Sequence, residues 1–181
     1  MSEERTAPQR IRITGLQESQ LAALVELEKA CTAMYHDAGF DAAEVPPRNV
    51  GELARLPRDH NLHVAEADHE VAGYTAWRDE APGIAYIAEL SVHPDFQRFG
   101  IARRLWNALR EDASKHGIGA AVVRCWSKAP WAMGFYKDAG FVPIDDGSPP
   151  KVRAWLDNMA ASGRPVCRPG EVALWAKTST P

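Results

Sequence analysis

One strand-turn-helix passage, residues 90–116, constrains the fold of this chain more than any other part of its sequence. The strand ends at Val92, because Pro94 has no amide hydrogen to donate to a sheet. A helix follows at once, and apolar residues recur along one side of it at steps of three and four: Ile101, Leu105, Ala108, Leu109 and Ala113. Gly117 is expected to end this helix as a left-handed cap. The passage therefore predicts a helix that packs against a sheet.

The rest of the chain alternates strand-like and helix-like segments. Apolar alternation and short apolar runs predict strands at residues 11–14, 62–67, 71–78, 84–92, 120–126, 141–144 and 172–177. Helical spacing predicts helices at residues 19–35 and 151–161, and a short helix at 51–56. Asp68 and His69, between two of the strands, predict a hairpin. We therefore expect an α/β (α+β) fold with a mixed, mostly antiparallel sheet flanked by helices.

The chain is long enough for one substantial core and short for two. It has 181 residues, of which 45% are hydrophobic, so we expect a single domain over residues 1–181. The net charge of -3 gives no basic excess, which argues against nucleic acid or an anionic membrane surface as a partner. No apolar run approaches the roughly 18 residues of a membrane span, and the polar N-terminus does not resemble an export signal.

The cysteines indicate a reducing compartment. Cys31, Cys125 and Cys167 are odd in number, far apart in the chain and not at metal-ligand spacing. Stable disulfides are rare in the cytoplasm, so we expect a cytoplasmic protein with three ordinary thiols and no metal site. None of the three is predicted to be a nucleophile.

The start of the helix after residue 100 is a candidate anion site. The first turn of a helix leaves backbone N–H groups unpaired, and the helix dipole adds positive charge there. Gly100 and Ala102 would let a phosphate approach the backbone, and Arg98 and Arg103 would add charge. The alternative is an ordinary helix start with surface arginines. The Gly-Lys-Ser/Thr ending of a nucleoside-triphosphate loop and the three glycines of a dinucleotide turn are both missing from this stretch.

Two motifs lie in order along the chain. Residues 97–102 read Gln-Arg-Phe-Gly-Ile-Ala, and residues 135–141 read Phe-Tyr-Lys-Asp-Ala-Gly-Phe. They resemble the Gln/Arg-x-x-Gly-x-Gly/Ala and Phe-Tyr-x-x-x-Gly-Phe signatures of the GNAT superfamily of acyl-CoA-dependent N-acetyltransferases. The resemblance covers a core at residues 60–144 well and residues 11–35 loosely. An insert at residues 145–170 has no counterpart, and the family commonly ends with a strand like the one predicted at 172–177.

The resemblance implies that acetyl-CoA is the cosubstrate. Its pantetheine arm would lie along the backbone groups of the strand end: Leu90, Ser91 and Val92. Its phosphates would be held by the residues of the turn: Gln97, Arg98, Phe99, Gly100, Ile101, Ala102 and Arg103. A free backbone N–H near the end of this strand would donate to the thioester oxygen in the transition state.

Tyr136 is implied to be the acid that protonates the departing thiolate. A phenol ordinarily stays protonated at neutral pH, so it can donate to a thiolate as that forms. The competing interpretation is a core aromatic residue that packs with Phe135. The sequence departs from the family at Ala129, where an asparagine is frequent, and at Pro130 and Trp131, which replace a more usual polar helix start.

Glu89 is the candidate general base, because it interrupts an otherwise apolar strand just before the residues implied to contact the cofactor. A carboxylate in such a strand is costly unless it is paired or useful. A structural salt bridge with Arg78 or Arg124 is the competing interpretation. His93 is a weaker candidate base, and deprotonation through water stays open. The sequence shows no cysteine or serine paired with a histidine that would act as a nucleophile, so we expect direct transfer in a ternary complex.

The sequence thus predicts transfer of an acetyl group from acetyl-CoA to a primary amine of a small molecule or peptide. A non-catalytic acyl-CoA-binding sensor or regulatory module is the alternative, because it would use the same phosphate turn. A longer acyl group or a hydroxyl acceptor would keep the same fold. The first helix, the lobe at residues 38–57 and the insert are expected to shape the acceptor site. Exposed aromatic strands would be compatible with a homodimer.

Overall fold

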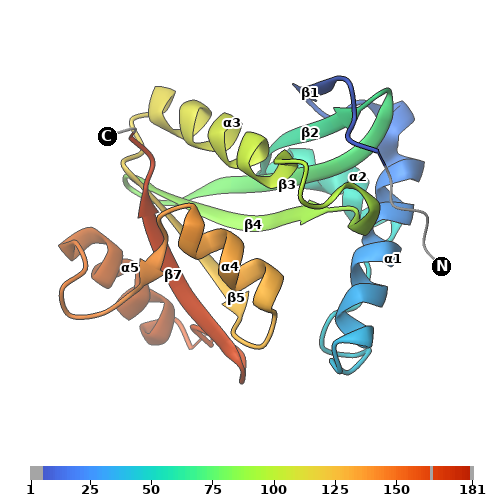
Figure 1. The fold of residues 1–181 in the computed structure, drawn as a ribbon. Helices are drawn as coiled ribbons and strands as arrows, with labels where there is room; N and C mark the ends of the chain where they lie inside the picture. The colour runs from blue at the N-terminus through green and yellow to red at the C-terminus, as the bar shows by residue number, and fades with distance from the viewer. Residues whose placement is uncertain (1–5, 164, 180–181) are drawn as a thin grey trace. The chain divides into compact units, whose positions relative to one another are not determined.

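The computed structural model describes residues 6–163 and 165–179. Its strands are β1 Ile11–Thr14, β2 Asn61–Ala67, β3 Glu70–Ala81, β4 Ile84–Val92, β5 Ala120–Trp126, β6 Val142–Pro143 and β7 Glu171–Lys177 (Figure 1). Its α-helices are α1 Leu21–Asp37, α2 Val50–Asp59, α3 Ile101–Lys115, α4 Pro130–Asp138 and α5 Pro150–Ala161. Two short 3-10 helices, η1 Glu18–Gln20 and η2 Pro94–Phe96, precede α1 and α3.

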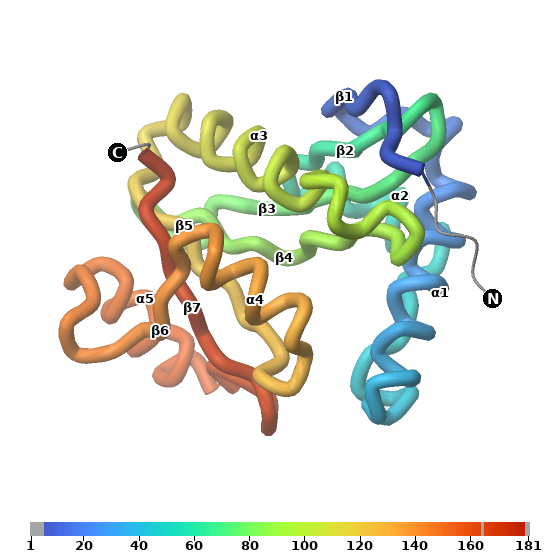
Figure 2. Tube along the Cα trace, in the orientation of Figure 1, coloured from blue at the N-terminus to red at the C-terminus, as the bar shows by residue number. Residues whose placement is uncertain are grey.

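The seven strands follow the order β1-β2-β3-β4-β5-β7-β6 in one sheet. Strands β4 and β5 run parallel, whereas β1 with β2, β5 with β7, and β6 with β7 are antiparallel. Figure 2 traces the short strand β6 beside β7. These features confirm the expected mixed, mostly antiparallel sheet flanked by helices.

Contacts divide the described chain into two compact units. The first contains residues 6–76 and Glu89–Leu109, and the second contains Trp77–Ala88 and residues 110–179. Strands β3 and β4 and helix α3 each supply residues to both units. The single domain expected from the chain length stays a prediction.

Two apolar clusters lie on the strands of the first unit. One joins Val64 and Tyr74 to α1 and α2 through Leu24, Leu27, Cys31 and Leu53. The other joins Ala65 to the start of α3 through Ala67, Ala72, Phe96, Ile101 and Leu105. Val64 and Ala65 belong to different clusters because successive side chains of a strand point to opposite faces. The same strands therefore hold α1 on one face and the first turns of α3 on the other.

Local signals explain two further elements of the first unit. Asn49 caps α2: its side chain accepts hydrogen bonds from the amides of Gly51 and Glu52, and Glu52 accepts one from the Asn49 amide. The helix extends to Asp59 and is longer than the predicted 51–56. Asp68 and His69 have φ angles of 49° and 75°, which a two-residue hairpin turn requires. The predicted hairpin between β2 and β3 is confirmed.

The predicted insert helix is confirmed as α5, which packs on strands of the second unit. Val152, Trp155 and Met159 contact the buried residues Ile84, Ala120 and Val122. Residues 141–144 were expected to form a strand, but β6 spans only Val142–Pro143. The Ile144 amide donates to the Ala173 carbonyl at 3.1 Å, so contact with β7 continues one residue past this edge strand.

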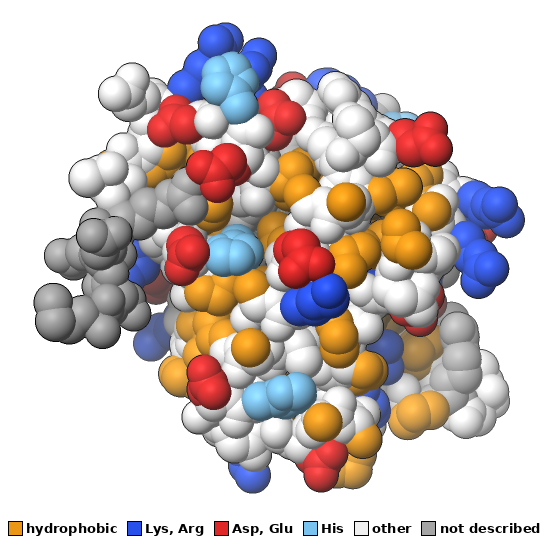
Figure 3. Space-filling view, turned by 90° about the vertical axis from the view of Figure 1, so that its right-hand side faces the viewer, with side chains coloured by type: hydrophobic (Ala, Val, Ile, Leu, Met, Phe, Trp, Pro, Cys, Tyr) orange, Lys and Arg blue, Asp and Glu red, His pale blue; other side chains and the backbone are white. Residues whose placement is uncertain are grey.

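The surface combines charges of both signs. On the face shown in Figure 3, acidic and basic side chains are interspersed with apolar ones, in keeping with the net charge of -3. Among residues 6–163 and 165–179, no helix has both the length and the apolar character that crossing a membrane requires.

Candidate functional site

The turn between β4 and α3 is held from both ends. Phe96 of η2 is buried, and it packs with Ile101 and Leu105, the inward residues of the first α3 turns. His93 accepts a hydrogen bond from the Asp95 amide through Nδ1, at 3.2 Å, which shapes the entry to η2. These contacts connect the strand, the turn and the helix start, in the order that the sequence predicts.

The backbone at the start of α3 is left-handed at two residues, and the space beside Gly100 is open. Arg98 and Gly100 both have left-handed φ angles, 67° and 78°. The Gly100 carbonyl accepts the hydrogen bond of the Arg104 amide at 3.1 Å, so the three amides between them precede the helical ladder. A Cβ atom built on Gly100 would meet no atom of the described residues within 4 Å. The helix start is thus accessible to a ligand, and an alternation of backbone conformations of this kind suits phosphate.

Gln97 has a bracing position within this turn. Its amide donates to the Pro94 carbonyl at 3.1 Å, and its side-chain Nε2 lies 3.2 Å from Met34 Sδ and 3.5 Å from the Val92 carbonyl. These contacts tie the turn to α1 and to the end of β4. The role of Gln97 in holding phosphates stays a prediction.

Gly73 lets strand β3 approach the segment Glu89–Val92 closely. A Cβ atom at Gly73 would lie 2.7 Å from the Ser91 carbonyl oxygen and 3.2 Å from Val92 Cγ2. Thr75 Oγ1, on the same strand, donates to the Glu89 carbonyl at 2.8 Å. Strand β3 therefore fixes the backbone of the predicted cofactor strand, a role that the sequence analysis did not assign to Gly73.

Glu89 forms a salt bridge, but with Arg48 and with neither of the two partners considered from the sequence. Arg48 Nη1 donates to Glu89 Oε2, and Ser91 Oγ donates to Glu89 Oε1 at 2.6 Å. Arg78 pairs with Glu80, and Arg124 donates to the Tyr86 hydroxyl. The expectation of Arg78 or Arg124 was wrong because the competing partner comes from a loop 41 residues earlier in the chain.

The Arg48–Glu89 pair extends into a buried network with Glu28 and Tyr74. The Tyr74 hydroxyl donates to Glu28 Oε1 at 2.6 Å, and Arg48 Nη1 donates to the Tyr74 oxygen at 3.3 Å. The Arg48 backbone amide donates to Glu28 Oε2 at 2.9 Å. One signal for Glu28 was present, since it lies on the apolar stripe of α1 between Leu24 and Cys31. Arg48 stands in an irregular segment that gave no such signal.

Burial shapes the protonation of this network. It raises the pKa of Glu28 above the ordinary 4.5; the charge of Glu89 adds to the rise, while hydrogen bonds from Tyr74 and Arg48 oppose it. It also raises the pKa of Tyr74 well above 10 and the pKa of Cys31 to about 12. Burial is the largest single effect on Arg48 and disfavours its charge, but Glu89, Tyr74 and Glu28 together outweigh burial and raise the pKa of Arg48. Arg48 therefore stays a cation beside two carboxylates.

Tyr136 lies in the second unit, in helix α4. The residue is 7% exposed, and its ring makes edge contacts with Phe135 and Phe141, at centroid distances of 5.3 and 5.0 Å. Pro130 occupies the first turn of the helix, and Ala129 precedes it as an N-cap without a side-chain hydrogen bond. The predicted base and turn belong to the first unit, so the common role of Tyr136 and Glu89 in one reaction stays a prediction.

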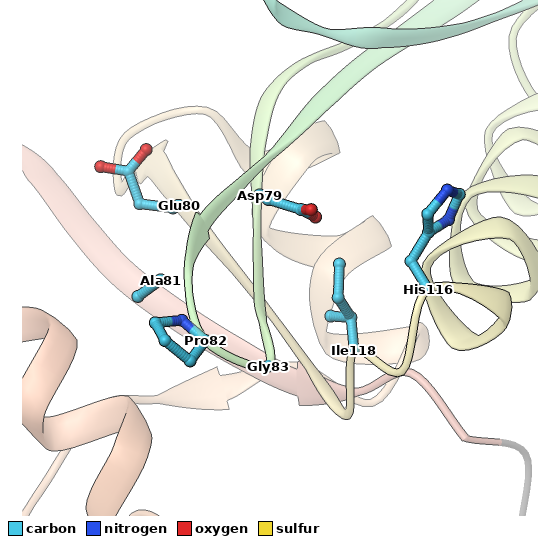
Figure 4. Close-up of a pocket in the computed structure, with 7 residues that line it drawn as sticks. All are labelled: Asp79, Glu80, Ala81, Pro82, Gly83, His116 and Ile118. Carbon is cyan, nitrogen blue, oxygen red and sulfur yellow. The ribbon is translucent and has the colours of Figure 1, made fainter.

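A hollow of about 370 Å³ in the second unit lies outside the predicted site. It is lined by residues 79–83, His116 and Ile118. In Figure 4 the Asp79 side chain points toward Ile118, whereas Glu80 points away to the other side of the strand. None of the residues predicted to bind the cofactor or to act in catalysis is among its lining residues. Among the described parts of the chain, no three His, Cys, Asp or Glu side chains are grouped to hold a metal.

Comparisons with known proteins identify the family of this chain. The chain matches a family model for the acetyltransferase (GNAT) domain over residues 51–159. No curated protein shows significant similarity to the sequence. Among solved structures, the PaiA N-acetyltransferase of Thermoplasma acidophilum, in complex with coenzyme A, superposes with a TM-score of 0.71 at 16% identity over 93% of this chain and 99% of its own.

Two further structures have the same fold. The ribosomal-protein-S18-alanine N-acetyltransferase of Escherichia coli gives a TM-score of 0.65 at 16% identity, over 95% of this chain and 96% of its own. A GNAT-family acetyltransferase of Staphylococcus aureus gives 0.70 at 14% identity, over 94% and 100%. The family model spans more than half of the chain and includes β4, the turn after it and α4. The chain therefore belongs to the GNAT acetyltransferase family.

Proposed function

We propose that this protein transfers an acetyl group from acetyl-CoA to a primary amine of a small molecule or peptide, by direct attack in a ternary complex. The observation that supports this most is the turn at Gly100, where the backbone is left-handed, a built Cβ atom would meet no described atom within 4 Å, and three amides precede the α3 ladder. The diphosphate of a coenzyme fits the chemistry of such a turn. The PaiA structure, which has this fold, contains coenzyme A.

The residues of the first unit would divide the binding of acetyl-CoA between strand and turn. Backbone groups of Leu90, Ser91 and Val92 would follow the pantetheine arm, on a strand that Gly73 and Thr75 hold in place. The diphosphate would be held by the turn residues Gln97, Arg98, Phe99, Gly100, Ile101, Ala102 and Arg103. Of these, Arg98 and Arg103 have exposed side chains that could add positive charge.

Glu89 would accept a proton from the attacking amine, and Tyr136 would return one to the leaving group. In the balanced reaction the amine nitrogen forms a bond to the acetyl carbon, and the bond from that carbon to sulfur breaks. The amine loses a proton to Glu89, and the thiolate gains one from the Tyr136 hydroxyl; exchange with water then removes the proton from Glu89 and returns one to Tyr136. A backbone N–H near Val92 would stabilise the oxyanion that forms between these events.

The cofactor site can be tested with a matched pair of glycine variants. Gly100 and Gly39 both have positive φ, 78° and 87°, and a Cβ atom meets no described atom within 4 Å at either. Gly100→Ala and Gly39→Ala should therefore lose similar stability from backbone strain. Only Gly100→Ala should weaken coenzyme A binding, measured by isothermal titration calorimetry. Equal affinity in both variants, or no affinity in the unmodified protein, would contradict the proposed cradle.

The reaction can be tested by thiol release from acetyl-CoA in the presence of a panel of amines, with mass measurement of each product. Tyr136→Phe should reduce kcat by about 10²-fold or more while leaving coenzyme A affinity unchanged. Unchanged turnover would remove the acid role from Tyr136. Tight coenzyme A binding without thiol release from any amine would favour a non-catalytic sensor. Accumulation of an acetylated protein during turnover would contradict direct transfer.

The three free thiols favour a reducing, cytoplasmic setting for this reaction. Cys31 and Cys125 are buried and Cys167 is half-buried. We infer no nucleophilic role for them, because burial raises the pKa of all three.

A further inference from the structure

One guanidinium nitrogen of Arg48 lies close to oxygen atoms of Glu89, Tyr74 and Glu28. Arg48 Nη1 donates to Glu89 Oε2 and to the Tyr74 hydroxyl, and it lies 3.6 Å from Glu28 Oε1. A guanidinium Nη has two hydrogens, so these three oxygens compete for two donors. Glu28 and Tyr74 therefore compete with Glu89 for the hydrogens of Arg48 Nη1.

Both ends of Arg48 are themselves fixed. Its backbone amide donates to Glu28 Oε2 at 2.9 Å, and the next residue, Asn49, caps helix α2. Glu28 is in turn held by the Tyr74 hydroxyl at 2.6 Å, and its side chain is only 7% exposed. Arg48 thus contacts α1 through Glu28 and β3 through Tyr74, and it directly precedes the cap of α2. Elements far apart in the sequence therefore orient the Arg48 side chain.

We propose that Arg48 is a positioning residue that orients Glu89 for proton transfer, with Glu28 and Tyr74 holding Arg48 in place. This inference rests on the proposed function, in which Glu89 is the base. Arg48 fixes one carboxylate oxygen of Glu89 and Ser91 fixes the other. Each carboxylate oxygen has a second lone pair, so an oriented carboxylate can still accept the proton of an amine.

Charge gives Arg48 a second effect on the same group. Among the described residues, Arg48, Glu28, Tyr74 and Cys31 interact electrostatically with Glu89, and Arg48 is the cation of these four. Without Arg48, two neighbouring carboxylates would remain partly desolvated with no counter-ion. One of them would then bind a proton more readily, which disables a base. Loss of Arg48 should therefore move the acid limb of the kcat profile to higher pH.

The first experiment compares steady-state kinetics of the full chain and its Arg48→Met, Arg48→Lys and Arg55→Met variants across pH. Arg55 is exposed on α2 and serves as the matched control. Arg48→Met should lower kcat at neutral pH by about tenfold to a hundredfold, below the full effect of a general base. It should leave KM for acetyl-CoA within about twofold and move the acid limb upward. Arg48→Lys should restore part of kcat, and Arg55→Met should match the unmodified protein.

The outcomes separate this inference from the proposed function. If the unmodified protein transfers acetyl groups and Arg48→Met keeps both its kcat and its pH profile, the positioning role is refuted and the activity stands. If Glu89→Gln keeps its turnover, the base assignment fails and Arg48 has nothing to orient. If the unmodified protein acetylates no amine, both the proposed function and this inference are refuted.

A second measurement follows the network without any turnover. In isotope-labelled protein, the Glu28 carboxyl signal can be assigned by its loss in Glu28→Gln and titrated by NMR. Arg48→Met should raise the pKa of Glu28 further, because a neighbouring cation is lost, and Glu89→Gln should lower it, because a neighbouring anion is lost. Arg55→Met should leave it unchanged. A Glu28 titration unaffected by Arg48→Met would refute the network, provided that circular dichroism shows the variant folded.

Discussion

The protonated form of Glu28 is favoured more in the folded protein than in the unfolded chain. Burial raises its pKa above the unfolded value of 4.5. Between these two pKa values the folded chain binds more protons than the unfolded chain, so the stability contributed by Glu28 falls as pH rises. This contribution is fully present below pH 4.5 and is lost as pH passes through the raised value.

Glu28→Gln should remove this pH dependence, because glutamine does not titrate. The free energy of unfolding of the variant minus that of the unmodified protein should shift in favour of glutamine as pH increases above 4.5. Urea unfolding at a series of pH values measures this difference. The absolute difference also includes hydrogen bonds with Tyr74 and Arg48, so the slope with pH is the informative quantity. A difference that is flat from acid to neutral pH would contradict the burial argument.

Two of the three thiols should be inert in the folded protein. Burial raises the pKa of Cys31 and of Cys125 to about 12, so almost no thiolate exists at pH 8. Cys167 is half-buried, and burial raises its pKa as well. Iodoacetamide followed by intact mass measurement should therefore modify Cys167 first and leave Cys31 and Cys125 free. All three should react in urea, and equal labelling of Cys31 in both conditions would be contrary to expectation.

At the scale of elements, Gly73 determines how closely β3 lies to the predicted cofactor strand. A methyl group there would press on the Ser91 carbonyl, which is backbone and cannot rotate away, at 2.7 Å. Gly73→Ala should cost about 1–3 kcal/mol of stability, as overpacking usually does, and should weaken coenzyme A binding. Thermal unfolding and calorimetric titration measure the two effects.

Gly134→Ala is the matched control for this substitution. Gly134 is exposed within α4, and a Cβ atom there meets no described atom within 4 Å. Because alanine favours a helix over glycine, this variant should be more stable by about 0.5–1 kcal/mol and should bind coenzyme A normally. A Gly73→Ala variant with full stability and full affinity would show that β3 and β4 can separate without consequence.

Elements with strong local patterns were predictable, and those decided by neighbours were not. Apolar spacing located α3 and the insert helix α5, and the turn residues Asp68 and His69 located the hairpin. The strand predicted at residues 141–144 is shorter in the structure, Val142–Pro143, because the extent of an edge pairing depends on the partner strand β7, which local spacing does not describe.

The candidate site divides in the same way. The turn at Gly100 is a local motif within one stretch of chain, so the sequence contains most of its geometry. The partner of Glu89 is a tertiary contact between residues 41 positions apart, and its donor lies in a segment without periodicity. Composition and spacing do not indicate which arginine reaches the half-buried carboxylate of Glu89, so Arg48 was identified only from the fold.

At the scale of the whole molecule, the two compact units share secondary structure. The boundary between them cuts through β3, β4 and α3, so neither unit contains these elements complete. If one unit unfolded alone, β3, β4 and α3 would each be interrupted, and the other unit would lose part of its own structure. We therefore expect one cooperative unfolding transition, as for a single domain.

Coenzyme A offers a direct test of this cooperativity. The proposed cradle belongs to the first unit, whereas five of the six tryptophans, all but Trp106, belong to the second. A ligand that binds only the folded state stabilises it by about 1.4 kcal/mol per tenfold rise in concentration above its Kd. If the chain unfolds as one domain, coenzyme A should raise the midpoint seen by tryptophan fluorescence as much as the midpoint seen by far-ultraviolet circular dichroism. Gly100→Ala should reduce the two shifts by the same amount. If coenzyme A raises the dichroism midpoint and leaves the fluorescence midpoint unchanged, the chain consists of two independent domains.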